Sequence, residues 1–62
     1  MDDHRYLWQQ GDTLVHVASR FLLDAGYADI YAYMDDIYAA NPAIIDFFAL
    51  APGTPLLLPW KA

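Results

Sequence analysis

Side chains that could carry acid–base, nucleophilic or metal chemistry are few in this chain and are poorly spaced for it. The two histidines, His4 and His16, do not lie four residues from one another, and there is no cysteine, so the usual spacing of a zinc site is missing. Ser19 follows His16 by three residues, but no third group is placed to orient the imidazole as in a nucleophilic triad. The adjacent Asp35 and Asp36 would point to different faces of a helix, which is unsuited to a carboxylate pair. We therefore expect no catalytic residue, no metal ligand and no cofactor.

The charge of the chain argues against two classes of partner. The formal net charge is −5, and the three basic residues, Arg5, Arg20 and Lys61, are scattered along the sequence. Binding to phosphates requires clustered lysine and arginine, so we expect no nucleic-acid partner and no anionic membrane surface. The first residues, MDDHR, do not resemble a secretory signal peptide. The acidic residues are expected to form a solvated surface, or alternatively to steer the protein toward a basic partner.

The length and the apolar content point to one small domain with a partner. We expect 62 residues to form a single domain, residues 1–62, whose own core is small. The apolar fraction is 58%, above the roughly 45–50% that is usual for globular domains. A domain of this size cannot bury the whole surplus, so we expect part of it to contact another protein.

Two amphipathic helices are expected to follow a short first strand. Tyr6–Gln9 is predicted as the strand, and Gly11 as the corner that leads into a helix of about 12 residues from Thr13. The apolar face of that helix contains Leu14, Val17, Ala18, Phe21 and Leu22, with Asp12 or Thr13 as the cap and Gly26 as the stop.

The second helix has a similar apolar face and clearer boundaries. Asp29 is the expected cap, and the helix should end at Asn41, in a left-handed conformation, before Pro42. Its predicted apolar face contains Ile30, Tyr33, Met34, Ile37 and Tyr38.

The end of the chain is expected to return to the first strand. We predict one or two helical turns in 43–51, a type II turn at Pro52 and Gly53, and a strand at Leu56–Leu58 that pairs antiparallel with Tyr6–Gln9. The predicted fold is therefore α+β, with the order βααβ and two helices packed on one face of a two-stranded antiparallel sheet. A structure without this strand pairing would instead favour a small helical domain.

The order of these motifs resembles the LysM domain family. The resemblance covers residues 6–59 and rests on four groups of residues: Gly11–Leu14 (GDTL), the Asn41–Pro42 pair, Pro52–Thr54 (PGT) and Leu56–Pro59 (LLLP). The segment between the helices, 22–33, is longer than in a typical cell-wall LysM repeat, and the module stands alone. Both features resemble the tail protein X family of contractile-tailed bacteriophages, in which Ala40–Pro42 and Ala51–Thr54 also have counterparts.

The resemblance implies a structural, non-catalytic role in a tail baseplate. LysM-like proteins of this kind join tube, hub and wedge or sheath-initiator subunits in phages and in related particles such as R-type tailocins. We would accordingly expect the protein to be made in the host bacterial cytoplasm and to reside in the virion tail baseplate. The residues expected at the partner interface are Trp8, Tyr27, Tyr31, Phe47, Phe48 and Trp60, since tyrosine and tryptophan are favoured at interfaces.

The resemblance also implies an alternative function, the binding of N-acetylglucosamine in peptidoglycan or chitin. On the template of glycan-binding LysM domains, the groove would be lined by Asp12, Thr13 and Val15 on one side, with Ile44 and Ile45 opposite. The absence of an aromatic residue next to GDTL weakens the case for stacking on a sugar ring. Helix capping alone explains Asp12 and Thr13, and the two roles are not exclusive.

Overall fold

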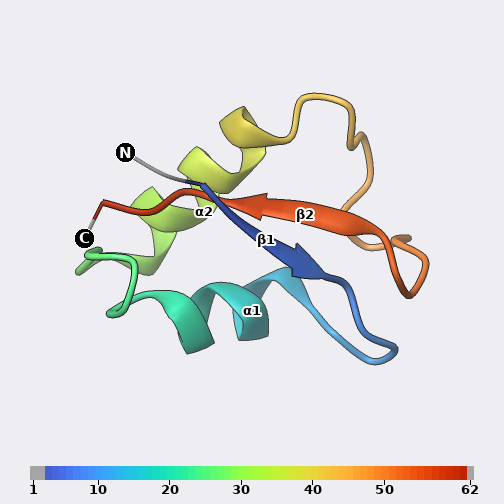
Figure 1. The fold of residues 1–62 in the computed structure, drawn as a ribbon, viewed down its shortest axis with the longest axis horizontal. Coiled ribbons are helices and arrows are strands. Elements are labelled where there is room, and N and C mark those ends of the chain that lie inside the picture. The colour runs from blue at the N-terminus through green and yellow to red at the C-terminus, as the bar shows by residue number, and fades with distance from the viewer. Residues whose placement is uncertain (1–2, 62) are drawn as a thin grey trace.

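Two strands enclose two helices along the chain. The computed structural model describes residues 3–61 and contains β1 (His4–Leu7), α1 (Leu14–Phe21), α2 (Ile30–Ala40) and β2 (Pro55–Leu58), in that order (Figure 1). The protein is thus an α+β domain with a βααβ arrangement, which confirms the predicted fold class.

The strands pair antiparallel, with Tyr6 opposite Leu56. The pairing continues past β1 as a β-bulge, in which Gly53 and Thr54 both oppose Trp8: the Trp8 amide donates to the Thr54 carbonyl at 2.9 Å and the Gly53 amide donates to the Trp8 carbonyl at 2.7 Å. The pairing excludes a purely helical domain and brings both ends of the described chain to one side of the molecule (Figure 1).

The first strand and the first helix differ clearly from their predicted bounds, and β2 begins one residue earlier than predicted, at Pro55. The first strand covers His4–Leu7 instead of Tyr6–Gln9, because Gln9 already belongs to the following turn. The first helix has 8 residues, not about 12. It ends early because the Gly26 amide donates to the Leu23 carbonyl at 3.0 Å and the Tyr27 amide to the Leu22 carbonyl at 3.0 Å, which closes turns in place of helix. Gly26 has φ +88°, as its predicted role as a stop requires.

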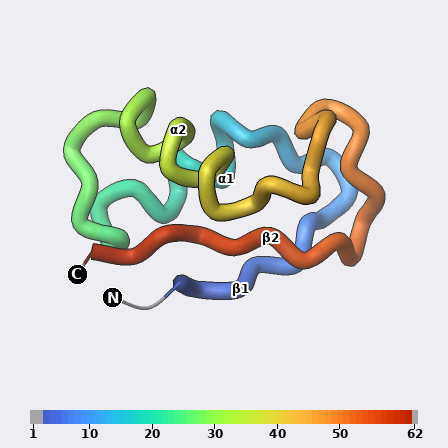
Figure 2. The backbone as a smooth tube through the Cα atoms, turned by 90° about the horizontal axis from the view of Figure 1, so that it is seen from above, coloured from blue at the N-terminus to red at the C-terminus, as the bar shows by residue number. Residues whose placement is uncertain are grey.

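Both helices lie on the same side of the two strands, and α2 contacts β2 directly (Figure 2). Most of the predicted apolar faces turn inward: Leu14, Val17 and Ala18 of α1 are buried, as are Tyr33 and Ile37 of α2. The remaining predicted residues of the two faces are partly buried, except Tyr38, which is 47% exposed. The expected caps are also present, since the Thr13 hydroxyl accepts the His16 amide and Asp29 accepts the Tyr31 amide. The rest of the core comes from Trp8, Ala25, Tyr27, Phe47, Leu56 and Leu58.

Asn41 ends α2, but not in the left-handed conformation that we expected. Its φ is −126°, and its side chain is buried, with 7% exposed. The side-chain Nδ2 of Asn41 donates to the carbonyls of Ile37, at 2.7 Å, and Leu57, at 2.8 Å. The backbone amide of Leu57 donates to Asn41 Oδ1 at 2.8 Å. Asn41 therefore ties the end of the helix to β2 and is more than a helix stop.

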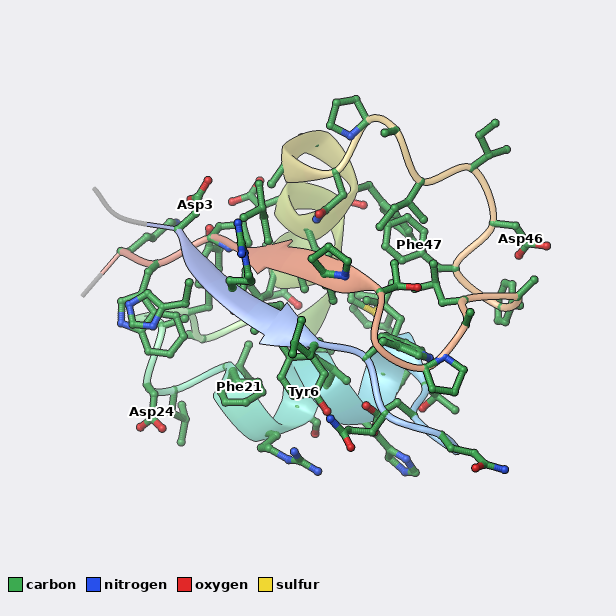
Figure 3. The ribbon with its side chains drawn as sticks, turned by 45° about the vertical axis from the view of Figure 1, so that its right-hand side comes forward. Asp3, Tyr6, Phe21, Asp24, Asp46 and Phe47 are labelled. Atoms are coloured by element: carbon green, nitrogen blue, oxygen red, sulfur yellow. The ribbon has the colours of Figure 1, made fainter. Side chains whose placement is uncertain are left out.

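The segment 43–51 is a loop without helical turns, contrary to the prediction. Asp46 Oδ1 accepts the Phe48 amide at 2.9 Å, a local side-chain turn that competes with helix. Of the apolar residues here, Phe47 points into the molecule and is buried (Figure 3). The predicted type II turn is present, since Gly53 has φ +88° and the Thr54 amide donates to the Ala51 carbonyl at 3.2 Å.

The molecule is elongated, with extents of 28 × 20 × 17 Å. The segment between α1 and α2 lies at one end of the longest dimension, and the 43–51 loop lies at the other (Figures 1 and 2). Within residues 3–61 no helix is long and apolar enough to cross a membrane.

Candidate functional site

A groove separates the turn before α1 from the loop before β2. One wall is the turn after β1 and the other is the end of the 43–51 loop, and the hollow measures about 250 Å³. This is slightly below the usual range for ligand pockets, which is roughly 300–1,000 Å³. Its lining residues are Trp8, Gln9, Gln10, Gly11, Asp12, Thr13, Leu14, Phe47, Phe48, Leu50 and Pro52.

Asp12 closes the turn that forms the first wall. Its Oδ2 accepts the Tyr6 hydroxyl at 2.5 Å and the Gln9 amide at 2.8 Å, and the Asp12 amide donates to the Gln9 carbonyl at 3.1 Å. These donors, the Tyr6 hydroxyl above all, lower the pKa of the Asp12 carboxyl, and the same bond raises the pKa of Tyr6. Of the two predicted caps, Thr13 is the one whose side chain accepts from α1; Asp12 instead holds the turn in place.

Aromatic rings form the second wall of the groove. Phe47 is buried against Tyr38, with ring centroids 5.0 Å apart, whereas the Phe48 side chain is 99% exposed. Gln9 and Gln10 on the facing wall are exposed and offer polar side chains. The groove thus combines an accessible aromatic ring with amide groups, a pairing suited to polar ligands that have an apolar face.

The structure gathers only part of the predicted glycan groove. Asp12 and Thr13 line it, but both use a side-chain oxygen to hold the turn and the start of α1. The other three residues, Val15, Ile44 and Ile45, do not line this groove. Val15 is exposed on α1, and Ile44 lines a different groove, beside the sheet.

The loop side of this groove is formed by Phe47, Phe48, Leu50 and Pro52, not by Ile44 and Ile45, which were placed there on the template of glycan-binding LysM domains. The turn at Pro52 and Gly53 is the sequence signal that could have located this wall. Gly53 bonds to Trp8, so the residues just before the turn, Phe48, Leu50 and Pro52, must face the residues just after Trp8. Pro52 and Gly53 therefore fix the site as well as the turn.

Three of the six expected interface residues are core residues. The side chains of Trp8, Tyr27 and Phe47 are almost fully buried, so they have little surface to offer a partner. Trp8 lies just beyond the end of β1. Side chains two residues apart along a strand point to the same face, so Trp8 lies on the inward face with Tyr6. The Tyr27 ring packs on Tyr33 at a centroid distance of 4.4 Å.

The other three expected residues keep exposed surface to different degrees. Phe48 and Tyr31 stand in solvent, Tyr31 with 72% of its side chain exposed. Trp60 is half-buried, because its ring stacks on His4 at 3.8 Å. Two further apolar side chains are highly exposed but were not predicted at the interface: Leu23, with 79% exposed, and Ile45, with 96% exposed. Nothing in the periodicity marked them, since both lie outside the helices and strands.

A second polar cluster lies beside the C-terminal segment. The Tyr27 hydroxyl donates to Asp36 Oδ2 at 2.6 Å, and the Lys61 ammonium lies 4.2 Å from the centre of the Tyr27 ring. Burial, followed by the bond to Asp36, raises the pKa of Tyr27 to about 12, so this phenol is protonated at neutral pH. Within residues 3–61 no three or more histidine, cysteine or acidic residues gather in a group that could hold a metal ion.

Comparison with known protein families, curated proteins and solved structures finds no match to this chain. The assignment to a LysM-like family accordingly remains a prediction, which rests on the order of the motifs in the sequence.

Proposed function

We propose that the protein is a structural, non-catalytic component of the baseplate of a contractile phage tail or of a related injection particle. The observation that carries the proposal is the exposure of large apolar side chains at both ends of the long dimension. Leu23 belongs to the segment that joins the helices and Tyr31 to the first turn of α2, whereas Ile45 and Phe48 belong to the 43–51 loop. The joining segment and the loop lie at opposite ends of the molecule (Figure 1). The family resemblance of the sequence supplies the particular assembly.

Docking at these surfaces would be driven by removal of apolar area from water. Burying one such side chain contributes about 1.5–3 kcal/mol. Aromatic residues such as Tyr31 and Phe48 are enriched at protein interfaces, and tyrosine is often found at their energetic centre. With an anchor pair at each end, one rigid domain can join two neighbours, as tube, hub or wedge subunits in a baseplate would require.

The proposal is tested in particles assembled by the bacterium that encodes the chain. A tagged protein should co-purify with sheathed tails through a density gradient, and the double variant Leu23→Ser/Tyr31→Ser should stay in the soluble fractions. Ser19→Ala, a change on the exposed face of α1, is the matched control and should co-purify like the wild type. Tails that assemble fully and lack the protein would contradict the proposal.

The groove supports a second candidate function, recognition of N-acetylglucosamine polymers. The specific observation is that the exposed Phe48 lines the same hollow as Gln9 and Gln10, so an aromatic surface and amide groups are available to a sugar. The test is co-sedimentation with insoluble peptidoglycan, with soluble chitin oligomers as competitor. Pelleting that the oligomers abolish, and that Gln10→Ala weakens while Ser19→Ala does not, would favour glycan binding over docking.

A further inference from the structure

An apolar projection stands in the 43–51 loop. We call Ile45, Asp46 and Phe48 the loop knob. Its two apolar side chains are 96% and 99% exposed, the highest values among the described apolar residues, and Asp46 lies between them, pointing away from the molecule (Figure 3). Phe47 anchors the knob in the core, and the bond from the Phe48 amide to Asp46 Oδ1 fixes its conformation. The knob therefore presents two apolar groups with one carboxylate between them.

A complementary hollow lies directly beside the knob. We call it the sheet groove; it measures about 350 Å³ and is lined by Arg5, Ala40, Asn41, Pro42, Ala43, Ile44, Pro55 and Leu57. Of these residues Arg5 alone carries a charge, and it sits opposite Leu57 in the strand register. The backbone amide and carbonyl of Leu57 are already hydrogen-bonded to Asn41, so they need no partner in the groove. The groove therefore offers mainly apolar surface, with the Arg5 cation at one side.

We propose that the loop knob of one molecule seats in the sheet groove of a second copy of this chain. Ile45 and Phe48 would cover Leu57, Pro55 and Pro42. Asp46 would reach Arg5 of the other copy, since one of its carboxylate oxygens is used by the Phe48 amide and the other is left for the guanidinium. The match is one of charge as well as shape, because the knob carries a single acid and the groove a single base.

The position of the two features selects the symmetry. Ile44 lines the sheet groove and Ile45 begins the knob, so the two surfaces adjoin on one end of the molecule. Adjoining complementary surfaces can be exchanged reciprocally about a two-fold axis, which closes a dimer and buries two knobs at once. A standard interface covers about 800 Å² per partner, about a fifth of the 4179 Å² surface of this chain, so one end of the molecule suffices.

This pairing goes beyond the baseplate proposal, because it assigns the exposed Ile45 and Phe48 side chains to a second copy of this chain and leaves Leu23 and Tyr31 for other subunits. It uses the loop end, whereas the particle test above uses Leu23 and Tyr31 at the other end. Failure of one test therefore leaves the other interpretable.

The first arm of the test is a charge swap followed by sedimentation equilibrium across a concentration series. Arg5→Asp and Asp46→Arg should each weaken the monomer–dimer equilibrium by about tenfold or more, because each places like charges together. The double variant Arg5→Asp/Asp46→Arg should restore the dimer to within about threefold of the wild type. Recovery in the double variant would support the pairing, because loss of the Asp46 turn alone could not be rescued by a change at Arg5. Arg5→Asp keeps that turn, so an Arg5→Asp variant that dimerises like the wild type would overturn the proposal.

The second arm removes the apolar contact. Phe48→Ser should shift the protein to monomer, and Leu23→Ser, an equally simple loss of an exposed apolar side chain at the far end, should leave the dimer unchanged. Circular dichroism confirms that each variant is folded. A wild-type protein that stays monomeric at millimolar concentration, or a Phe48→Ser variant that dimerises like the wild type, would contradict the inference.

Discussion

The Asn41 side chain pairs with the backbone of β2 as a residue of a neighbouring strand would. Its side-chain amide accepts the Leu57 amide and donates to the Leu57 carbonyl, which is the exchange that a neighbouring strand residue would make. It also donates a hydrogen bond to the Ile37 carbonyl near the end of α2. One side chain thereby satisfies the outer edge of β2 and joins it to the helix that covers the sheet.

Replacing Asn41 should therefore be costly. We expect Asn41→Ala to lower the free energy of unfolding by roughly 2–3 kcal/mol, because it leaves the Leu57 and Ile37 groups without their partners. Asn41→Asp, which keeps Oδ1 but puts an oxygen against two carbonyls, should be no better. Urea unfolding followed by circular dichroism measures both changes; a loss below about 0.5 kcal/mol for Asn41→Ala would show that water replaces the amide at no cost.

Removal of the buried Tyr33 hydroxyl is expected to raise stability, in contrast to the loss expected at Asn41. The side chain is fully buried in the core, and its hydroxyl has no hydrogen-bond partner within the described residues. Burial raises the pKa of this phenol to about 12. We expect Tyr33→Phe to raise the free energy of unfolding by about 1 kcal/mol, since it removes an unsatisfied polar group and keeps the ring. Tyr38→Phe, at an exposed hydroxyl, is the control; a clear loss of stability in Tyr33→Phe would reveal a bound partner such as an internal water.

At the scale of the elements, the turn between β1 and α1 is held by a carboxylate and should respond to acid. The Tyr6 hydroxyl and the Gln9 amide hold the pKa of Asp12 below its usual 3.8 in the folded protein. The folded state therefore binds this proton less readily than the unfolded chain. The contribution to stability is complete above pH 3.8 and is lost as the pH falls through the lowered pKa of the folded protein.

The matching measurement is the unfolding of wild type and Asp12→Asn between pH 7 and pH 2. The variant should be the less stable protein at neutral pH, and the difference should shrink as the pH falls below the ordinary carboxyl range. Tyr6→Phe removes the main donor and should reduce the same pH dependence. A difference between wild type and Asp12→Asn that stays constant over the whole range would show that the charge of Asp12 is not what holds the turn.

The elements also show which parts of the structure could be predicted from sequence. The helix faces followed from apolar residues at three- and four-residue steps, and the turn at Gly53 followed from a residue type with few alternatives. The loop 43–51 has an apolar composition too, but only long-range packing decides that Phe47 turns inward while Ile45 and Phe48 turn out. The wall of the groove was misplaced for this reason, and Trp8 was assigned to an interface because a strand pattern does not show which face is covered.

At the scale of the whole molecule, the surplus of apolar residues is divided between the core and the two ends of the long dimension. The core takes Trp8, Tyr27 and Phe47, which the sequence analysis had assigned to a partner interface. The most exposed of the remaining large apolar side chains are Leu23 and Tyr31 at one end and the loop knob at the other, and Leu7, Val15, Tyr38 and Leu57 are exposed to a smaller degree. A small domain with an apolar group at each end is suited to joining neighbours in an assembly, which is the function that we propose.

The central claim is tested most directly by a cryo-electron microscopy map of tail particles from the bacterium that encodes the chain. We predict density for a βααβ domain within the baseplate, with Leu23 and Tyr31 of that domain buried against a neighbouring subunit. A baseplate map in which every subunit is assigned and this chain is missing, or in which the chain is present with both side chains in solvent, would contradict the proposed function.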